Sequence, residues 1–308
     1  MMKKKHIILY LLALLTLAFT ACADDDSFST STSNRLYFTS DTISLDTIFS
    51  KVPSVTKTFW VHNNSGDGIR CSSIRLKNGN QTGFRVNVNG VYLGNAQGFQ
   101  ISDEEIRKGD SIRVFVEVTT PMNNQDLPQL VTDDLLFALE SGTQQSVNLR
   151  VWSWDAELLR DVIVSHDTII ASTKPTVIYG GITVKEGATL TIPAGKTLYF
   201  HDNAGIKVNG RLLCKGEAGN EVVLRGDRLD HMFDYLPYDG VSGQWGGIVL
   251  ESSSYGNEMT FTDLHSSCHA IYCDSSDVTR PKLSMKASTI HWPGKCSASH
   301  SFIGELTP

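Results

Sequence analysis

The stretch 226–240 (GDRLDHMFDYLPYDG) concentrates side chains of the types that bind ligands. Carboxylate oxygens accept hydrogen bonds from sugar hydroxyls or coordinate Ca²⁺, and aromatic rings stack on the apolar faces of sugars. The stretch has no EF-hand or Gly-Asp repeat, so it predicts no metal. The alternative is a solvated loop over the edge of the structure beneath it. The candidate binding residues are Asp227, Asp230, Asp234, Tyr235, Tyr238 and Asp239.

A second group of reactive side chains comprises His265, Cys268, His269 and Cys273. Cys and His at close spacing can hold zinc, but the group has no C-x-x-C pair and no second ligand pair. We therefore expect buried thiols and assign no metal and no cofactor. In an oxidising compartment, either a Cys268–Cys273 or a Cys273–Cys296 disulfide can form, and the sequence does not choose between these two pairings.

The N-terminal segment predicts a secretory signal peptide at residues 1–21. Three lysines at 3–5 precede an apolar core at 7–19 and the small residue Ala21. The segment Phe19-Thr20-Ala21-Cys22 resembles the lipobox of bacterial lipoproteins, although Phe19 stands where Leu is usual. The resemblance implies cleavage before Cys22, acylation of its thiol with palmitate-type chains and attachment to a membrane. Two or more acyl chains make a stable anchor.

An acidic run follows the predicted anchor. Asp24, Asp25 and Asp26 resemble the export signal that carries lipoproteins of Bacteroidota to the outer face of the outer membrane. The alternative is the solvated start of a linker. Residues 22–34 then form a polar Ser/Thr-rich tether. The resemblance implies a lipid-anchored outer-membrane protein facing the cell exterior.

Charge disfavours nucleic acid as a partner. The net charge of the chain is −6, and removal of residues 1–21 leaves 24 basic against 33 acidic residues, a net charge of −9. Binding to a phosphate backbone requires a basic surface. The expected partners are the membrane, through the lipid, and a glycan or a surface protein.

Residues 35–155 predict an antiparallel β-sandwich. Short runs of alternating apolar and polar residues are separated by turn signals, of which Asn89-Gly90 is the strongest. The pattern at Phe59–Gly66, Ile74–Leu76, Gly83–Val86 and Gly109–Ile112 resembles immunoglobulin-like domains of the Hydin and choice-of-anchor kind. This resemblance implies a fold and says little about function. Trp152 and Trp154 predict a packing pair at the module boundary, with a sugar-stacking platform as the alternative.

Residues 156–290 predict a short right-handed parallel β-helix. Apolar pairs begin at Ile182, Leu190, Leu198, Ile206, Leu212 and Val222, with glycines between them. Strands this short bury enough surface only when the chain coils and the coils stack. Residues 180–226 and Gln244–Ile248 resemble pectate-lyase-like bacterial β-helix proteins. The fold class is therefore all-β: an immunoglobulin-like sandwich followed by a β-helix.

These patterns favour a non-catalytic binding or structural role. No G-x-S-x-G, H-E-x-x-H or phosphate-binding loop is present. A polysaccharide lyase or glycoside hydrolase is the alternative, because β-helices also host those enzymes. The outward positions predicted for the regular strands carry no Arg and no ladder of carboxylates: they are Thr183, Thr191, Tyr199, Lys207, Leu213 and Val223.

The last segment, 291–308 (HWPGKCSASHSFIGELTP), leaves the repeat pattern. Terminal coils normally carry a cap that covers unpaired strand edges and core, and no amphipathic helix is apparent here. We therefore hypothesise a longer natural β-helix with a truncated or frame-shifted end.

Overall fold

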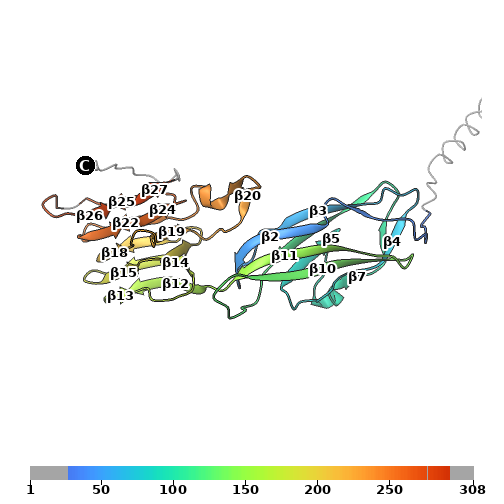
Figure 1. Cartoon of the computed structure of the whole chain (residues 1–308), viewed down its shortest axis with the longest axis horizontal. Coiled ribbons are helices and arrows are strands. Elements are labelled where there is room, and N and C mark those ends of the chain that lie inside the picture. The colour runs from blue at the N-terminus through green and yellow to red at the C-terminus, as the bar shows by residue number, and fades with distance from the viewer. Residues whose placement is uncertain (1–26, 276, 292–308) are drawn as a thin grey trace, which may run out of the picture.

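The computed structural model describes residues 27–275 and 277–291, and these residues form an all-β protein, as predicted. Two modules lie end to end (Figure 1). The predicted signal peptide, Cys22, Asp24 to Asp26 and all but the first residue of the segment 291–308 lie outside the described residues. Within the described part of the chain, no helix combines the length and apolar character needed to cross a membrane.

The N-terminal module consists of two sheets around one core. Alternating residues of each strand point inward, as in β9, where Ile112, Val114, Val116 and Val118 are buried. The first sheet has the order β1 (Tyr37–Phe38), β3 (Lys57–His62), β9 (Ser111–Val118), β5 (Phe84–Val88) and β6 (Val91–Tyr92). The second has the order β2 (Thr42–Phe49), β11 (Gln144–Trp154), β10 (Gln129–Leu139), β4 (Ile69–Leu76) and β7 (Gln100–Ile101), with β8 (Glu104–Ile106) also pairing with β4.

Local signals place the turns of this module, with one departure from the predicted antiparallel order. Asn89 and Gly90 both have positive φ, 50° and 88°, and join β5 to β6 as a two-residue hairpin. Strand β2, however, pairs with β11 in parallel. Strand alternation predicts burial but not partner or direction, because parallel and antiparallel strands share the same side-chain period.

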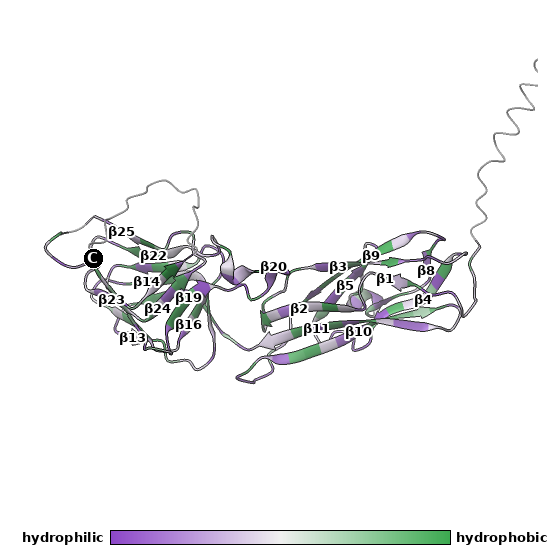
Figure 2. Ribbon diagram, turned by 45° about the horizontal axis from the view of Figure 1, so that its top comes forward, coloured by the Kyte–Doolittle hydropathy of each residue, from purple (hydrophilic) through white to green (hydrophobic). Residues whose placement is uncertain are grey.

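The second module, residues 157–291, is a stack of coils joined by parallel pairing. The predicted inward pairs are buried, and Leu198, Leu224 and Leu264 lie on successive neighbouring strands. Such curled parallel sheets are compatible with a β-helix. Figure 2 shows hydrophobic residues along these strands. The strands of the stack are β12 (Glu157–Val164), β13 (Thr168–Ile169), β14 (Thr176–Val184), β15 (Thr189–Pro193), β16 (Thr197–Phe200), β17 (Gly205–Val208), β18 (Arg211–Lys215), β19 (Val222–Gly226), β22 (Gly247–Leu250), β23 (Asn257–Thr260), β24 (Thr262–His265), β25 (Ile271–Cys273), β26 (Leu283–Lys286) and β27 (Thr289–His291).

The loop after β19 departs from the stack and returns at Trp245. It contains the hairpin β20 (His231–Phe233) and β21 (Leu236–Pro237) and the 3₁₀ turn Tyr238–Gly240. The Trp245 indole is fully buried, stacks on Phe200 at 4.3 Å between ring centroids, and donates its N–H to the His265 carbonyl. Gly247 follows with φ 84°, and a Cβ there would lie 1.6 Å from the His269 carbonyl oxygen. The close stacking of coils therefore requires glycine at this position.

The two modules meet through a small aromatic cluster. Phe49 of β2 packs edge-on against Tyr199 of β16 at 4.9 Å between ring centroids, and Trp154 lies 6.0 Å from Phe49. Tyr199, predicted to face outward, is thus buried beneath the N-terminal module. Trp154 takes the packing role predicted for the tryptophan pair, whereas 47% of Trp152 is exposed. The two tryptophans therefore have different environments, because only Trp154, which is nearer the boundary, packs in the cluster between the modules.

Candidate functional site

The outer face of the largest sheet of the coil module carries a column of polar and aromatic side chains. Parallel coils in register place equivalent residues one above another. Tyr199 pairs with Arg225, and His265 pairs with His291. Leu224 and Leu264 pair in register, Arg225 directly follows Leu224, and His265 directly follows Leu264. Arg225 and His265 therefore lie on the same face. The prediction that no Arg faces outward on the regular strands is therefore wrong, because Arg225 lies outward on β19, two residues after the predicted outward position Val223.

A first cluster on this face joins Arg160, Tyr179, His201 and Asp227. The Arg160 guanidinium lies 4.9 Å from the Tyr179 ring centroid, and the Tyr179 and His201 rings are 4.5 Å apart. Nδ1 of His201 lies 2.7 Å from Oδ2 of Asp227. Burial raises the pKa of Asp227, against the lowering effect of His201. The cluster thus exposes a cation and aromatic rings above a mostly buried carboxyl group.

A second cluster lies further along the stack and is an ionic network. The Arg225 guanidinium contacts Asp239 at 2.7 Å, and Asp239 Oδ1 lies 2.8 Å from His265 Nε2. Asp263 lies 3.3 Å from His265 Nδ1 and 2.6 Å from His291 Nε2. Burial opposes the charge on His265, but the two carboxylates outweigh it and raise the pKa of His265 to about 9. An imidazole between two carboxylates is therefore charged at neutral pH.

Asp263, His265 and His291 are also the residues of this face that could hold a metal ion. One ligand atom from each lies within 4.8 Å of the others. Their origin in two neighbouring coils follows from register, because β24 and β27 pair in parallel. The sequence pointed to Cys268, His269 and Cys273 around His265 instead. In the structure, the partners of His265 are Asp263, two residues earlier in the chain, and His291, on the neighbouring strand of the next coil.

The six residues predicted to form one binding site in the loop do not all lie together. Asp227 and Asp239 belong to the two clusters above, and Asp230 is buried in a two-point pair with Arg228 at 2.6 Å for both contacts. The Arg228 guanidinium also lies 3.8 Å from the Tyr238 ring centroid. These contacts fix the base of the loop, so Asp230 and Tyr238 hold its shape.

The tip of the same loop is different, because its large side chains face solvent. Tyr235 is 82% exposed and Phe233 is 53% exposed, and their rings stack at 5.6 Å between centroids. Asp234 lies between them and is exposed. Exposed aromatic residues that gather in one place are typical of binding surfaces. Of the six predicted residues, Asp234 and Tyr235 lie in such a position.

The predicted thiol cluster does not form as expected. Cys268 is disulfide-bonded, whereas Cys273 is free and exposed. Both disulfides considered from the sequence require Cys273 and are therefore wrong. A buried thiol stack is also wrong, since Cys273 ends β25 at the surface. Among the residues that the structure describes, the buried free thiols are instead Cys71 and Cys214, one in each module, and burial raises the pKa of each to about 12.

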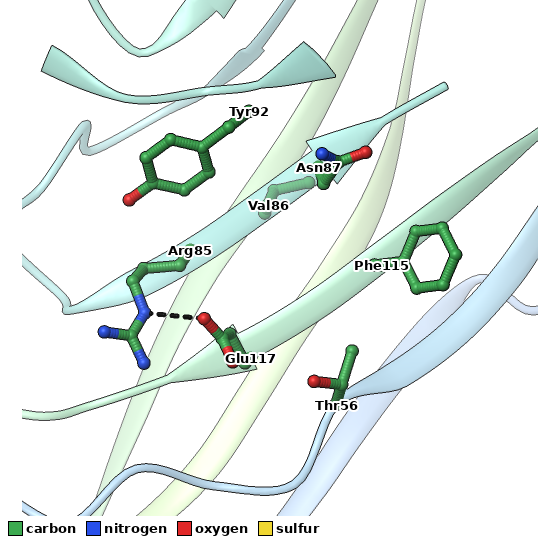
Figure 3. Close-up of a pocket in the computed structure, with 7 residues that line it drawn as sticks. All are labelled: Thr56, Arg85, Val86, Asn87, Tyr92, Phe115 and Glu117. Atoms are coloured by element: carbon green, nitrogen blue, oxygen red, sulfur yellow. Dashed lines mark ion pairs between the residues drawn. The ribbon is translucent and has the colours of Figure 1, made fainter. Parts of the chain in front are cut away.

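The N-terminal module has a concave site of its own on the outer face of the first sheet. Its volume is about 280 Å³, and its lining includes Thr56, Arg85, Asn87, Tyr92, Phe115 and Glu117 (Figure 3). The Arg85 Nε donor lies 2.9 Å from Glu117 Oε1 across β5 and β9. The ion pair and the half-exposed Tyr92 ring make this groove a second candidate surface for a polar ligand.

Comparison with known proteins adds little to this geometry. No protein-family model matches the chain, and no curated protein matches it. One similar solved structure is a family 123 glycoside hydrolase from Clostridium perfringens, with 7% identity and a TM-score of 0.26, covering 42% of this chain and 30% of the hydrolase. Another is a PapD-like domain of human CEP192, with 12% identity and a TM-score of 0.26, covering 44% of this chain and 95% of that domain. The chain thus spans less than a third of the hydrolase.

Proposed function

We propose that this chain is a lipid-anchored surface protein that binds a glycan without chemical change, through the tip of the loop 227–240. The observation that carries the proposal is the exposed, stacked pair Phe233 and Tyr235. A sugar ring presents apolar C–H groups to an aromatic face and hydroxyl groups at its edge. Asp234, between the two rings in the chain, supplies a carboxylate that accepts hydrogen bonds from those hydroxyls.

The rest of the loop supports this role because several side-chain contacts hold its base. The Arg228–Asp230 pair and the Arg228–Tyr238 contact fix the loop base. His231 also lies 3.7 Å from Asp46 of the N-terminal module. A preformed aromatic tip loses little conformational entropy on binding. Loops on a rigid scaffold are the usual place for binding residues.

The test is a glycan array with the purified chain, followed by titration of the best ligand. Tyr235→Ala is expected to weaken binding about 2- to 12-fold, because an aromatic stacking contact contributes about 0.5–1.5 kcal/mol. Tyr92→Ala, in the groove of Figure 3, is the matched control and leaves binding unchanged. Loss of binding in Tyr92→Ala with normal binding in Tyr235→Ala would move the site to the N-terminal module. An array without any ligand rejects glycan binding.

The anchoring part of the proposal depends on Cys22 and is tested separately. Cells that express the chain should incorporate labelled palmitate into it, and Cys22→Ser should abolish the label. Replacing Asp24, Asp25 and Asp26 by Ala should reduce cleavage by protease added to intact cells, while palmitate incorporation persists. A label that persists in Cys22→Ser contradicts lipidation at this residue.

One observation favours a polysaccharide-degrading enzyme as the second candidate. Asp227 is largely buried and hydrogen-bonded to His201, and burial raises its pKa, as in a general acid. Reducing ends and unsaturated products are measured after incubation with polysaccharides. Product release that Asp227→Asn abolishes would establish the enzyme and overturn the non-catalytic proposal. Asp110→Asn, an exposed acid of the N-terminal module, is the control.

A further inference from the structure

Asp263, His265 and His291 are brought together by the register of two coils. Strands β24 and β27 pair in parallel, with His265 opposite His291 and Asp263 opposite Thr289. The two imidazole rings stack at 4.8 Å between centroids with planes 28° apart. Asp263 lies two residues before His265, so it shares the outward face. Three donor groups thus converge on one point of the sheet.

The donor atoms have separations suited to one small ion. Oδ1 of Asp263 lies 2.6 Å from His291 Nε2, and Oδ2 lies 3.3 Å from His265 Nδ1. All three ligand atoms lie within 4.8 Å of one another. Nitrogen and oxygen ligands about 2.0–2.2 Å from a tetrahedral Zn²⁺ are roughly 3.3 Å apart. Small side-chain rotations would therefore bring the three donors to one ion.

A second layer of contacts fixes His265 in the orientation that coordination requires. Its Nε2 lies 2.8 Å from Asp239 Oδ1, and Arg225 lies 2.7 Å from that same oxygen. A metal-bound histidine commonly donates its other ring N–H to a carboxylate, which selects the tautomer and orients the ring. In this geometry Nε2 donates to Asp239, and Nδ1 is the atom directed at Asp263; a metal ion that binds Nδ1 displaces the proton from this nitrogen to solvent. The His265 ring is also 4% exposed, so packing restrains it.

We propose that Asp263, His265 and His291 form a binding site for a divalent late transition metal ion, with Zn²⁺ as the reference ion. Two imidazole nitrogens with one carboxylate favour zinc and its neighbours, whereas Ca²⁺ and Mg²⁺ require mainly oxygen ligands. About a third of the side-chain surface of His291 (34%) and Asp263 (29%) is exposed. An ion can therefore enter from solvent, and a water molecule can supply a fourth ligand.

The site joins the binding loop to the coil stack. Asp239 comes from the loop, whereas its neighbours Arg225 and His265 come from β19 and β24. An ion bound to Asp263 and His265 would lie next to the contact between His265 and Asp239, which holds the end of this loop. The proposal is independent of any glycan, because it depends on these side chains alone.

The test uses tag-free, full-length protein dialysed against a chelator and titrated calorimetrically with ZnCl₂. One Zn²⁺ per chain is expected, with no heat from CaCl₂ or MgCl₂ at the same concentrations. His291→Gln should weaken zinc binding more than about 100-fold, and Asp239→Asn should weaken it about 10–100-fold. His166→Gln is the control, because His166 is an exposed histidine of the coil module outside both clusters. It leaves binding unchanged.

Cobalt distinguishes this site from one built on cysteine. Co²⁺ at the proposed site gives the visible bands of a four- or five-coordinate nitrogen and oxygen set, without the near-ultraviolet sulfur-to-cobalt band. The same spectrum in Cys273→Ser supports the proposal. A sulfur band that Cys273→Ser removes overturns it, as does the absence of binding at millimolar Zn²⁺. Equal zinc affinity in His291→Gln and unmodified protein also overturns it. If His291→Gln fails to fold, the cobalt spectrum and Asp239→Asn decide.

Discussion

The two modules use charged side chains in different ways, although both are built from β-strands. In the N-terminal module, Lys77–Asp134 and Arg85–Glu117 are ion pairs across neighbouring strands, and Arg70 contacts both Glu105 and Glu140; these side chains are largely open to solvent. In the coil module, parallel register repeats one side-chain position from coil to coil, and a long loop covers part of the resulting column. The ionic groups there form a network with buried members. In this chain, parallel stacking therefore aligns charged side chains from successive coils on one face.

The largest difference that we predict within the chain concerns thiol reactivity. Cys71 and Cys214 are fully buried, one in each module, and burial raises the pKa of both thiols from 9.0 to about 12. Cys273 is exposed. The thiolate is the reactive form, and a rise of three pKa units reduces it about 1,000-fold. Burial raises the pKa of the Cys273 thiol as well, but iodoacetamide reaches this exposed residue without opening of the fold. Mass spectrometry after iodoacetamide treatment should therefore show Cys273 modified much faster than the other two.

The same two thiols then serve as reporters of each module. Labelling of Cys71 and Cys214 requires opening of the module that buries them. Equal acceleration of both by mild denaturant would mean that the modules unfold as one unit. Rapid labelling of Cys214 without denaturant would contradict the buried core of the coil module.

Trp245→Ala should have the next largest effect. Its buried ring stacks on Phe200, and its N–H is bonded to the His265 carbonyl. Removing a buried aromatic side chain costs about 3–5 kcal/mol. Cys214 should therefore label much faster in this variant, while Cys71 changes little. Phe137→Ala, which removes a fully buried ring of the N-terminal module, is the matched control and should reverse that order.

Asp155→Asn tests the junction between the modules and should cost about 1–3 kcal/mol. Asp155 is fully buried and accepts bonds from the backbone N–H groups of Asn123 and Asn124, with Lys174 at 3.8 Å. Burial alone would raise the pKa of Asp155, but the Ser50 hydroxyl together with these contacts outweighs it and lowers the pKa. Its stabilising effect is therefore present above the unfolded-state pKa of about 3.9 and is lost as pH falls through the lower folded-state pKa.

Urea unfolding at several pH values measures this effect. The difference between unmodified protein and Asp155→Asn should be full at pH 7 and should shrink only at pH values below about 4. Asp126→Asn, at an exposed acid nearby, is the control. A difference that stays constant to low pH would mean that the carboxylate charge is not what stabilises the junction.

The sequence predicts the cores better than it predicts the site. Alternating apolar residues such as Leu198 and Phe200 show which side chains are inward, because burial follows directly from strand period. The site depends on which strands become neighbours. His265 and His291 are 26 residues apart and meet only through coil register, and Arg225 meets Asp239 only because the loop folds back. Local patterns also do not show that Tyr199 is covered by Phe49 of another module.

The smallest effect that we predict compares one ion pair from each module. Arg85–Glu117 has both side chains 38% exposed, whereas Asp230 in the Arg228–Asp230 pair is 8% exposed. Exposed pairs contribute about 0.2–1 kcal/mol, since water screens them. Double-mutant cycles with Ala, measured by urea unfolding, should give a coupling energy in that range for Arg85–Glu117 and a larger one for Arg228–Asp230. Raising the salt concentration should weaken the first coupling more than the second, because buried charges are screened less. Equal couplings with equal salt dependence would mean that the loop base is as open to solvent as the outer face of the N-terminal sheet.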